Sequence, residues 1–325
     1  MTEALAHYWH PVAMSEEVTA KPARFRLLGE PLVLFRDDEG PVALSDLCIH
    51  RGAALSLGWL TDGRITCPYH GWHYDRSGTC VKIPSVPDGR PIPAKARTNS
   101  YRAQEAYGLV WVAMKEPIAP LPNVIPWDEA GYHRTHIGTW TMQSSAGRVI
   151  ENSLDFSHFA WSHEGVLGVR DACIAQRYDA NETEYGLYFE YVHTIPASSP
   201  ITGGTAQNVH MTYDLTLPYS LVSCQTRKGT MGEHTWLFLA ACPIDDRTSR
   251  IYHFQFRNHD LHITDETIRA FALPVIEEDR VIIESQRPEE IPLNLREELH
   301  IKLPDTASIL YRRLLARAGL EREGS

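Results

Sequence analysis

Residues 48–73 read CIHRGAALSLGWLTDGRITCPYHGWH and contain two short motifs that each join a cysteine to a histidine. In the first motif His50 lies two residues after Cys48, and after sixteen intervening residues Cys67 begins the second motif, in which His70 lies three residues later. A glycine lies within two residues after each motif, which is typical of tight loops between strands. Two thiols and two imidazoles in two such loops predict a metal site.

The ligand set of this site favours one kind of metal centre. Two thiolates and two imidazoles distinguish a Rieske [2Fe–2S] cluster, in which histidine replaces cysteine on one iron. A Cys2His2 zinc site uses the same residue types, but it usually pairs Cys with Cys and His with His. Each loop here supplies one of each. We therefore predict that Cys48, His50, Cys67 and His70 bind a [2Fe–2S] cluster with a redox-active edge near the surface.

We predict that three residues close to these loops are not cluster ligands. Trp72 is predicted to shield the cluster, and His73 to be a loop histidine rather than a ligand. Cys80 has no partner at ligand spacing, so we expect a small buried residue there.

A second group of metal-ligating residues lies in residues 147–168, GRVIENSLDFSHFAWSHEGVLG. We expect a helix over 147–163. Asp155 and His158 are three residues apart and share a face of such a helix. His158 and His163 are five apart and diverge by roughly 140° on an ideal helix. Both histidines can therefore reach one metal only if the helix widens or breaks between them.

Two histidines and one carboxylate form the facial triad of O₂-activating iron sites. Two aspartates are candidates for the carboxylate ligand. Asp155 is the local candidate. Asp279 lies in an expected helix from Asp265 to Gln286, on the face that also carries Ile276 and Ile283. A solitary acid on such a face is costly unless it is paired or metal-bound. A buried aspartate paired with a base is the alternative.

The motifs CIH, CPYHGW, ENSLDFSHFAWSH and VIEEDRVIIES, in this order, resemble those of the oxygenase α subunit of Rieske non-haem iron oxygenases over nearly the whole chain. The similarity is greatest to the single-subunit group, which includes dicamba and vanillate O-demethylases, toluenesulfonate methyl hydroxylase and saxitoxin-pathway hydroxylases. The resemblance implies that His158, His163 and Asp279 hold a mononuclear Fe(II). It also implies that Asp155 bridges His158 to the cluster ligand His70 of a neighbouring subunit, usually in a trimer.

Asn152 matches a position near the iron in the same resemblance. A capping or core asparagine is an equally good interpretation of this residue. For the cavity walls, Trp161 and Leu167 are candidates, and strands over 184–258 should supply the rest. Because side chains alternate along a strand, the sequence leaves open which face points inward.

The pattern of elements predicts an α+β protein with two domains. Short alternating runs over residues 24–114 indicate a small antiparallel β domain, and a proline-rich passage over 116–132 marks a linker. Long alternating strands bracketed by helices follow, with a last helix from Asp305 to Ala318. We assign residues 1–116 to a Rieske domain and residues 117–325 to a catalytic domain. The resemblance implies a helix-grip fold for the second domain.

The family resemblance also predicts the reaction, in which O₂ is the co-substrate and electrons come from NAD(P)H. No nicotinamide or flavin motif occurs in the chain, so a separate reductase must supply the electrons, directly or through a ferredoxin. We expect hydroxylation or oxidative demethylation of a small aromatic or heterocyclic substrate. Ring cis-dihydroxylation is the alternative. A Rieske electron carrier and a noncatalytic helix-grip binding protein are candidates of other classes.

Composition and charge limit the binding partners and the cellular compartment that we expect. The 325 residues carry a net charge of −10, which disfavours binding to nucleic acid or to an anionic membrane. No apolar stretch approaches the length of a membrane span, and the N-terminal residues lack the pattern of a signal peptide. Six cysteines are too sparse for a disulfide framework in this chain. We therefore expect a soluble cytoplasmic protein.

Overall fold

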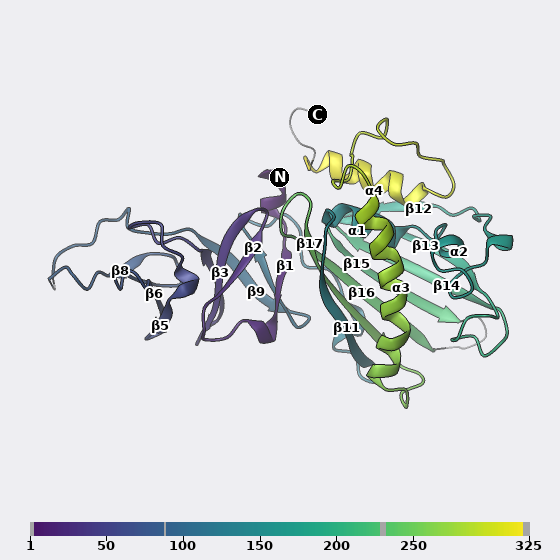
Figure 1. Ribbon diagram of the computed structural model, residues 1–325, viewed down its shortest axis with the longest axis horizontal. Helices are drawn as coiled ribbons and strands as arrows, with labels where there is room; N and C mark the ends of the chain where they lie inside the picture. Colours follow the sequence, from purple (N-terminus) through teal and green to yellow (C-terminus); the bar gives the residue numbers. More distant parts are fainter. Residues whose placement is uncertain (1–2, 88, 228–231, 321–325) are drawn as a thin grey trace. The chain divides into compact units, whose positions relative to one another are not determined.

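The computed structural model describes residues 3–87, 89–227 and 232–320. The chain forms two compact units, Glu3–Ala119 and Pro120–Ser325 (Figure 1). Each unit has sheets and a hydrophobic core of its own. Within the described residues, no helix combines the length and the apolar character that a membrane crossing requires.

The first unit consists of two antiparallel sheets. The larger sheet has the strand order β1-β10-β9-β4-β3-β2 and the smaller one β5-β6-β7-β8. The strands are β1 (His10–Met14), β2 (Ala23–Leu27), β3 (Glu30–Asp37), β4 (Gly40–Ser45), β5 (Trp59–Thr61), β6 (Arg64–Thr66), β7 (His73–Tyr74), β8 (Cys80–Lys82), β9 (Ser100–Ala106) and β10 (Leu109–Ala113). The two metal-motif loops flank β5 and β6, so this small sheet holds them at fixed separation.

Three tight turns explain why these residues form hairpins. The turns at Leu28-Gly29, Asp62-Gly63 and Tyr107-Gly108 each have positive φ at both residues, from 50° to 83°. Two consecutive positive φ values define the type I′ turn, whose twist matches that of the strands it connects. Glycine at the second position adopts this conformation without a steric penalty.

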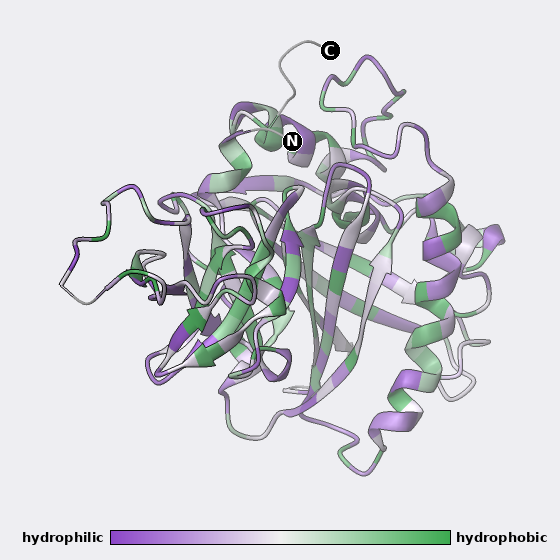
Figure 2. Ribbon diagram, turned by 60° about the vertical axis from the view of Figure 1, so that its left-hand side comes forward, coloured by the Kyte–Doolittle hydropathy of each residue, from purple (hydrophilic) through white to green (hydrophobic). Residues whose placement is uncertain are grey.

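The second unit is built on one antiparallel sheet of seven strands, in the order β11-β17-β16-β15-β14-β13-β12. Its strands are β11 (His133–Met142), β12 (Ala180–Thr183), β13 (Gly186–Ile195), β14 (Gln207–Thr216), β15 (Ser220–Arg227), β16 (His234–Pro243) and β17 (Ser249–Arg257). Hydrophobic and hydrophilic residues alternate along the strands, as Figure 2 shows. With its helices on this sheet, the unit confirms the predicted α+β class.

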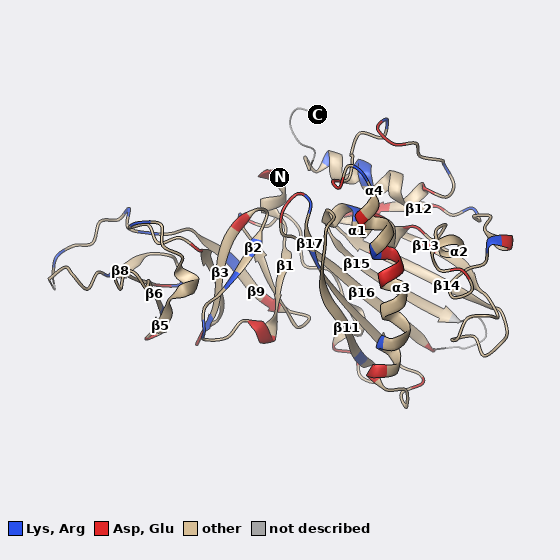
Figure 3. Ribbon diagram, in the orientation of Figure 1, with Lys and Arg blue, Asp and Glu red and all other residues tan. Residues whose placement is uncertain are grey.

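Four α-helices accompany the sheet in the described residues: α1 (Ala146–Leu154), α2 (Phe159–Ser162), α3 (Asp265–Ser285) and α4 (Thr306–Arg317). Figure 1 shows α3 lying across one face of the sheet. The hydroxyl of Thr264 caps its first turn, where Asp265 and Glu266 face the positive end of the helix dipole. Figure 3 shows a second acidic group in its C-terminal half.

Two buried arginines tie α1 and α4 together. Arg148 on α1 donates to Glu298 at 2.6 Å, and Arg312 on α4 donates to Glu151 at 2.6 Å. Both guanidinium groups are almost completely buried. Removing one partner from such a pair costs about 3–5 kcal/mol, because it leaves a buried charge uncompensated. The network therefore fixes the position of α1, which leads directly into the candidate site.

Candidate metal centres and substrate cavity

The two cysteine loops of the first unit have the same backbone geometry. In each loop the cysteine carbonyl accepts a hydrogen bond from the glycine four residues later, from Gly52 to Cys48 at 2.8 Å and from Gly71 to Cys67 at 3.0 Å. Both glycines have positive φ, 72° and 71°. A side chain at either position would strain the turn. Two equivalent loops thus present one thiol and one imidazole each.

The four motif side chains gather in two layers. Cys48 and Cys67 are buried, whereas His50 and His70 are exposed and their Nδ1 atoms lie 3.1 Å apart. Burial raises the pKa of the Cys67 thiol, and the adjacent Cys48 thiol raises it further. An inner thiol pair and an outer imidazole pair are the donor arrangement of a Rieske cluster, so these residues fit that group.

Neighbouring rings complete this site. Trp72 stacks on His50, with ring centroids 4.6 Å apart and planes 6° apart. The Tyr74 hydroxyl lies 3.1 Å from the Cys48 sulfur. Because burial raises the pKa of Tyr74, the phenol keeps its proton and can donate to that sulfur. Sequence reasoning missed Tyr74, although it lies within the CPYHGWHY motif.

The predictions for the other two residues near this motif have different outcomes. Cys80 is buried, as expected, and its sulfur lies 3.6 Å from the Lys82 carbonyl. The placement of His73 in a loop is wrong, because the residue belongs to β7, where it pairs with Thr66 on β6.

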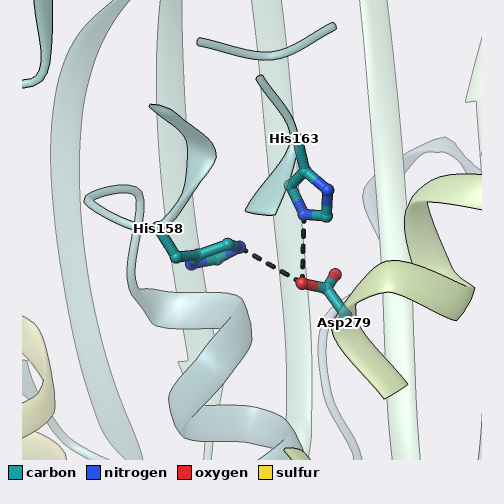
Figure 4. Close-up of side chains that lie close together, drawn as sticks. All are labelled: His158, His163 and Asp279. Atoms are coloured by element: carbon teal, nitrogen blue, oxygen red, sulfur yellow. Dashed lines mark hydrogen bonds and ion pairs between the residues drawn. The ribbon is translucent and has the colours of Figure 1, made fainter. Parts of the chain in front are cut away.

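The second unit brings His158, His163 and Asp279 together. Their ligand atoms all lie within 4.8 Å of one another. Figure 4 shows both imidazoles directed at the Asp279 carboxylate, with Oδ1 3.4 Å from Nε2 of His158 and 3.0 Å from Nε2 of His163. The histidines come from either end of α2, and the aspartate comes from α3.

The expectation of one helix over 147–163 is wrong, because the helix breaks at Asp155. There the backbone turns to an extended conformation, φ −94° and ψ 134°. The Asp155 carboxylate accepts a hydrogen bond from the Ser157 N–H at 2.7 Å. Such side-chain bonds compete with helical backbone bonds. Between the two histidines lies only the single turn of α2, and the backbone leaves helical geometry at His163, φ −120° and ψ 40°, so that both rings face the same point.

Each histidine also contacts a second carboxylate through its other ring nitrogen. Nδ1 of His158 lies 3.2 Å from Asp155, and Nδ1 of His163 lies 2.7 Å from Glu278. Sequence reasoning missed Glu278, because its side chain is 47% exposed and falls beside the inward face of the helix. Its adjacency to Asp279 was the available signal.

The electrostatics of this group suit a cation. Burial lowers the pKa of His158, but the bonds to Asp155 and Asp279 outweigh it and raise the pKa to about 9. Burial raises the pKa of Asp279, and the two histidines reverse this and hold the pKa below its ordinary value. The Asp279 carboxylate lies 3.4 Å from the buried Nε2 of His158, at ion-pair distance but without good hydrogen-bond geometry. Two imidazoles and one carboxylate that converge in this way fit an iron ion.

A cavity of about 570 Å³ adjoins this group. Its sheet wall consists of the odd-numbered side chains of the central strands, which answers the question of which face points inward. Leu167 lines the cavity, and so does Asn152 from α1. Trp161 is absent from the described lining and is 58% exposed, so its assignment to the wall is wrong. The side of α3 that carries Ile276, Asp279 and Ile283 faces the cavity rather than a solid core. Of the residues of α3, only Ile283 is buried.

Comparisons with known proteins agree with this architecture. Residues 8–102 match the Rieske [2Fe-2S] domain, and residues 142–321 match the vanillate O-demethylase oxygenase C-terminal domain. Methylxanthine N1-demethylase NdmA of Pseudomonas putida is 30% identical over 96% of this chain and 89% of its own length. The structure of NdmA with caffeine has a TM-score of 0.86 at 29% identity and covers 97% of this chain and 91% of that one. Dicamba monooxygenase bound to dicamba, 21% identical, shares the fold with a TM-score of 0.80 over 97% of this chain and 98% of its own.

A Rieske domain followed by an oxygenase domain defines an oxygenase of the Rieske class. The chain belongs to the Rieske non-haem iron oxygenases, with a catalytic domain of the vanillate O-demethylase type. The resemblance drawn from the motifs is thereby confirmed. Membership supports a Rieske cluster and iron as cofactors, a reductase partner and a small-molecule substrate.

Proposed function

We propose that the chain is the oxygenase component of a multicomponent monooxygenase, which hydroxylates or oxidatively demethylates a small aromatic or heterocyclic substrate. The observation that carries this proposal is the convergence of two imidazoles and one carboxylate on the wall of a cavity of about 570 Å³. Such a ligand set leaves metal positions open for O₂. The similarity to a methylxanthine N1-demethylase supports demethylation as the outcome.

In this proposal His158, His163 and Asp279 hold Fe(II). Cys48, His50, Cys67 and His70 would hold the cluster. When bound, the cluster would supply single electrons and the iron would supply oxygen insertion, in which one atom of O₂ enters a substrate C–H bond and the other leaves as water, with consumption of two electrons and two protons. The electrons come from NAD(P)H through a separate reductase, with or without a ferredoxin. A hydroxylated N-methyl or O-methyl group then separates from its heteroatom as formaldehyde.

The chain's own residues orient the ligands and exclude water. Asp155 accepts the Nδ1–H of His158 and so directs Nε2 toward the metal position. The cavity is mostly lined by apolar side chains, among them Met142, Leu239, Ile251 and Ile276. A dry cavity strengthens polar interactions inside it and protects reactive species from water.

We also infer a homotrimer in which electrons cross between subunits. Asp155 would accept a hydrogen bond from His70 of the partner subunit while it holds His158 of its own chain. Two features support this arrangement: His70 is exposed, and the Asp155 side chain is 30% exposed although it already holds His158. One carboxylate would then connect the two metal centres.

Reductase-coupled turnover tests the proposal. The iron-loaded protein would be supplied with NAD(P)H, a Rieske reductase and ¹⁸O₂, and offered N-methyl heterocycles, aryl methyl ethers and methylarenes. We expect formaldehyde, or a product that carries one ¹⁸O atom. Asp279→Ala should abolish product and keep the cluster spectrum, whereas Glu277→Ala, on the exposed side of α3, should remain active. A cis-diol with two ¹⁸O atoms would establish dihydroxylation instead, and cluster reduction without any product would favour an electron carrier.

A further inference from the structure

Two ring nitrogens in the cavity wall have no hydrogen-bond partner in the part of the chain that the structure describes. Trp140 on β11 and His253 on β17 both line the cavity, and their rings meet edge to face with centroids 6.3 Å apart. Nε1 of Trp140 and Nδ1 of His253 are buried without a hydrogen-bond partner among the described residues. Leaving such a buried group unpaired is destabilising, because it loses its hydrogen bond to water and gains none in return. Two unpaired nitrogens side by side in a cavity point to a ligand that would pair them.

The backbone beside these rings is shaped to place the indole. The pairing of β11 with β17 shifts register between His136 and Gly138, and Gly138 then lies opposite His253. A Cβ at Gly138 would lie only 2.9 Å from Cζ3 of Trp140, so the indole rests directly on the glycine. Bulges of this kind re-aim side chains beside functional sites.

The pair lies near the candidate iron site and carries no charge. Burial, together with the nearby His136 and against the opposing charge of Asp279, lowers the pKa of His253 to about 4. The influence of Asp279 indicates that the imidazole is within electrostatic reach of the triad. A neutral imidazole has one donor and one acceptor nitrogen, and an indole has one donor.

The remainder of the cavity disfavours an anion. Among the described lining residues Arg257 alone carries a permanent positive charge. Its terminal nitrogens donate to Thr135 and to the Ile263 carbonyl, and only its Nε has no partner among the described residues. It lies four positions from His253 along β17, roughly 13 Å away at the rise of a strand. Burying a carboxylate beside Trp140 without a cation would be strongly unfavourable, because the charge would lose its hydration uncompensated.

We propose that Trp140 and His253 are the polar recognition pair of the cavity, and that the substrate is an uncharged planar heterocycle with a carbonyl or ring-nitrogen acceptor. The acceptor receives the Nε1–H of Trp140, and His253 donates to the second lone pair of the same carbonyl oxygen or bonds a second polar atom of the ring. Leu239, Ile251 and Ile276 surround the hydrocarbon part. This inference deepens the proposed oxygenase function and rests on it.

Anaerobic calorimetric titration of the iron-loaded protein tests the pair without turnover. The probes are three bicyclic compounds of similar size: the neutral lactam N-methyl-2-quinolone, the hydrocarbon 1-methylnaphthalene and the anion 1-methyl-2-naphthoate. We expect the lactam to bind about tenfold more tightly than the hydrocarbon, as one to two hydrogen bonds would give, and the carboxylate to bind most weakly.

Variants assign the difference to the two rings. Trp140→Phe and His253→Phe should each lower lactam affinity about tenfold and leave hydrocarbon affinity within about twofold. Trp236→Phe is the matched control, because its indole N–H bonds Tyr132 outside the described cavity lining. The cluster spectrum and iron content verify folding. Equal binding of lactam and hydrocarbon, tightest binding of the carboxylate, or equal loss of both neutral probes would overturn the proposal.

This binding experiment separates the pair from the chemistry. If turnover fails but lactam binding depends on Trp140 and His253, recognition stands and the oxygenase proposal falls. If demethylation occurs while both variants bind the lactam as the native protein does, the recognition pair falls alone.

Discussion

Nδ1 of His163 lies 2.7 Å from a carboxylate oxygen of Glu278, the residue that directly precedes Asp279 in α3. Nε2 of the same ring lies 3.0 Å from Asp279. Two consecutive residues of one helix therefore contact the two nitrogens of one imidazole. A carboxylate on Nδ1 keeps the proton there and leaves the Nε2 lone pair for a metal.

Glu278→Ala should weaken binding of the mononuclear iron by about tenfold, because the imidazole loses the group that fixes its tautomer. Glu278→Gln should recover much of the loss, since its amide oxygen can still accept a hydrogen bond from the Nδ1–H of His163. Iron content after dialysis against graded Fe(II), read beside an unchanged cluster spectrum, measures the effect. Glu277→Ala is the control. Equal iron affinity in all three variants would assign Glu278 no role in orienting His163.

Asp155 and Asp279 should differ in what their loss removes. Asp279→Ala should lose the mononuclear iron and keep the cluster. Asp155→Asn should keep both metals and reduce its cluster normally, but fail to pass the electron on, because it lacks the charge that, in the proposed trimer, couples His158 to His70 of the partner subunit. Single-turnover oxidation of the pre-reduced cluster, with substrate and O₂, measures this. If Asp155→Asn empties the site and Asp279→Ala stays iron-replete and active, the two roles are reversed.

Tyr74→Phe should make the cluster harder to reduce. The hydroxyl that lies 3.1 Å from the Cys48 sulfur would be lost, and hydrogen bonds to cluster sulfurs raise the reduction potential. A redox titration followed by the visible spectrum should show a more negative midpoint. Tyr69→Phe provides the comparison, because Tyr69 is exposed and its ring lies against His70. An unchanged midpoint in Tyr74→Phe would mean that the hydroxyl does not donate to the cluster.

Anaerobically purified protein should contain about three irons and two acid-labile sulfides per chain. Mild chelation should remove the mononuclear iron first, because its ligands line an accessible cavity whereas the two cysteines are buried. Iron and sulfide assays before and after chelation measure this. A colourless protein that contains only zinc would refute the cluster assignment.

His253 should make the fold sensitive to acid. Its pKa falls from an ordinary 6.5 to about 4 through burial, so between these pH values the unfolded chain binds a proton that the folded chain does not. Stability contributed by the neutral ring is thus complete above pH 6.5 and is lost toward pH 4, by up to about 1.4 kcal/mol per pH unit. Thermal unfolding of His253→Phe should depend less steeply on pH over this window. His262→Phe, at an exposed position, should match the native slope.

Prediction from the sequence succeeded where the informative residues lie close together in the chain or follow a regular period. Cys48 and His50 are two residues apart in one loop, and the position of Asp279 followed from helical periodicity alone. The break at Asp155 was not predictable from periodicity, because a side-chain bond to Ser157 produces it. Glu278 was missed because its helical position indicates solvent. The inward face of the strands required coordinates, since a period of two fits both faces equally.

The close group of His158, His163 and Asp279 draws all its members from α2 and α3, whereas the sheet contributes only cavity wall. This separation of the metal-ligating group from the cavity wall affects how substrate specificity can change in such proteins. Single substitutions at positions such as Ser223, Gln225 or Leu237 reshape the chamber one strand at a time, and none of them removes a residue of that group. New substrates can therefore be acquired through small successive changes in the sheet, while mutations in the two helices put the chemistry itself at risk.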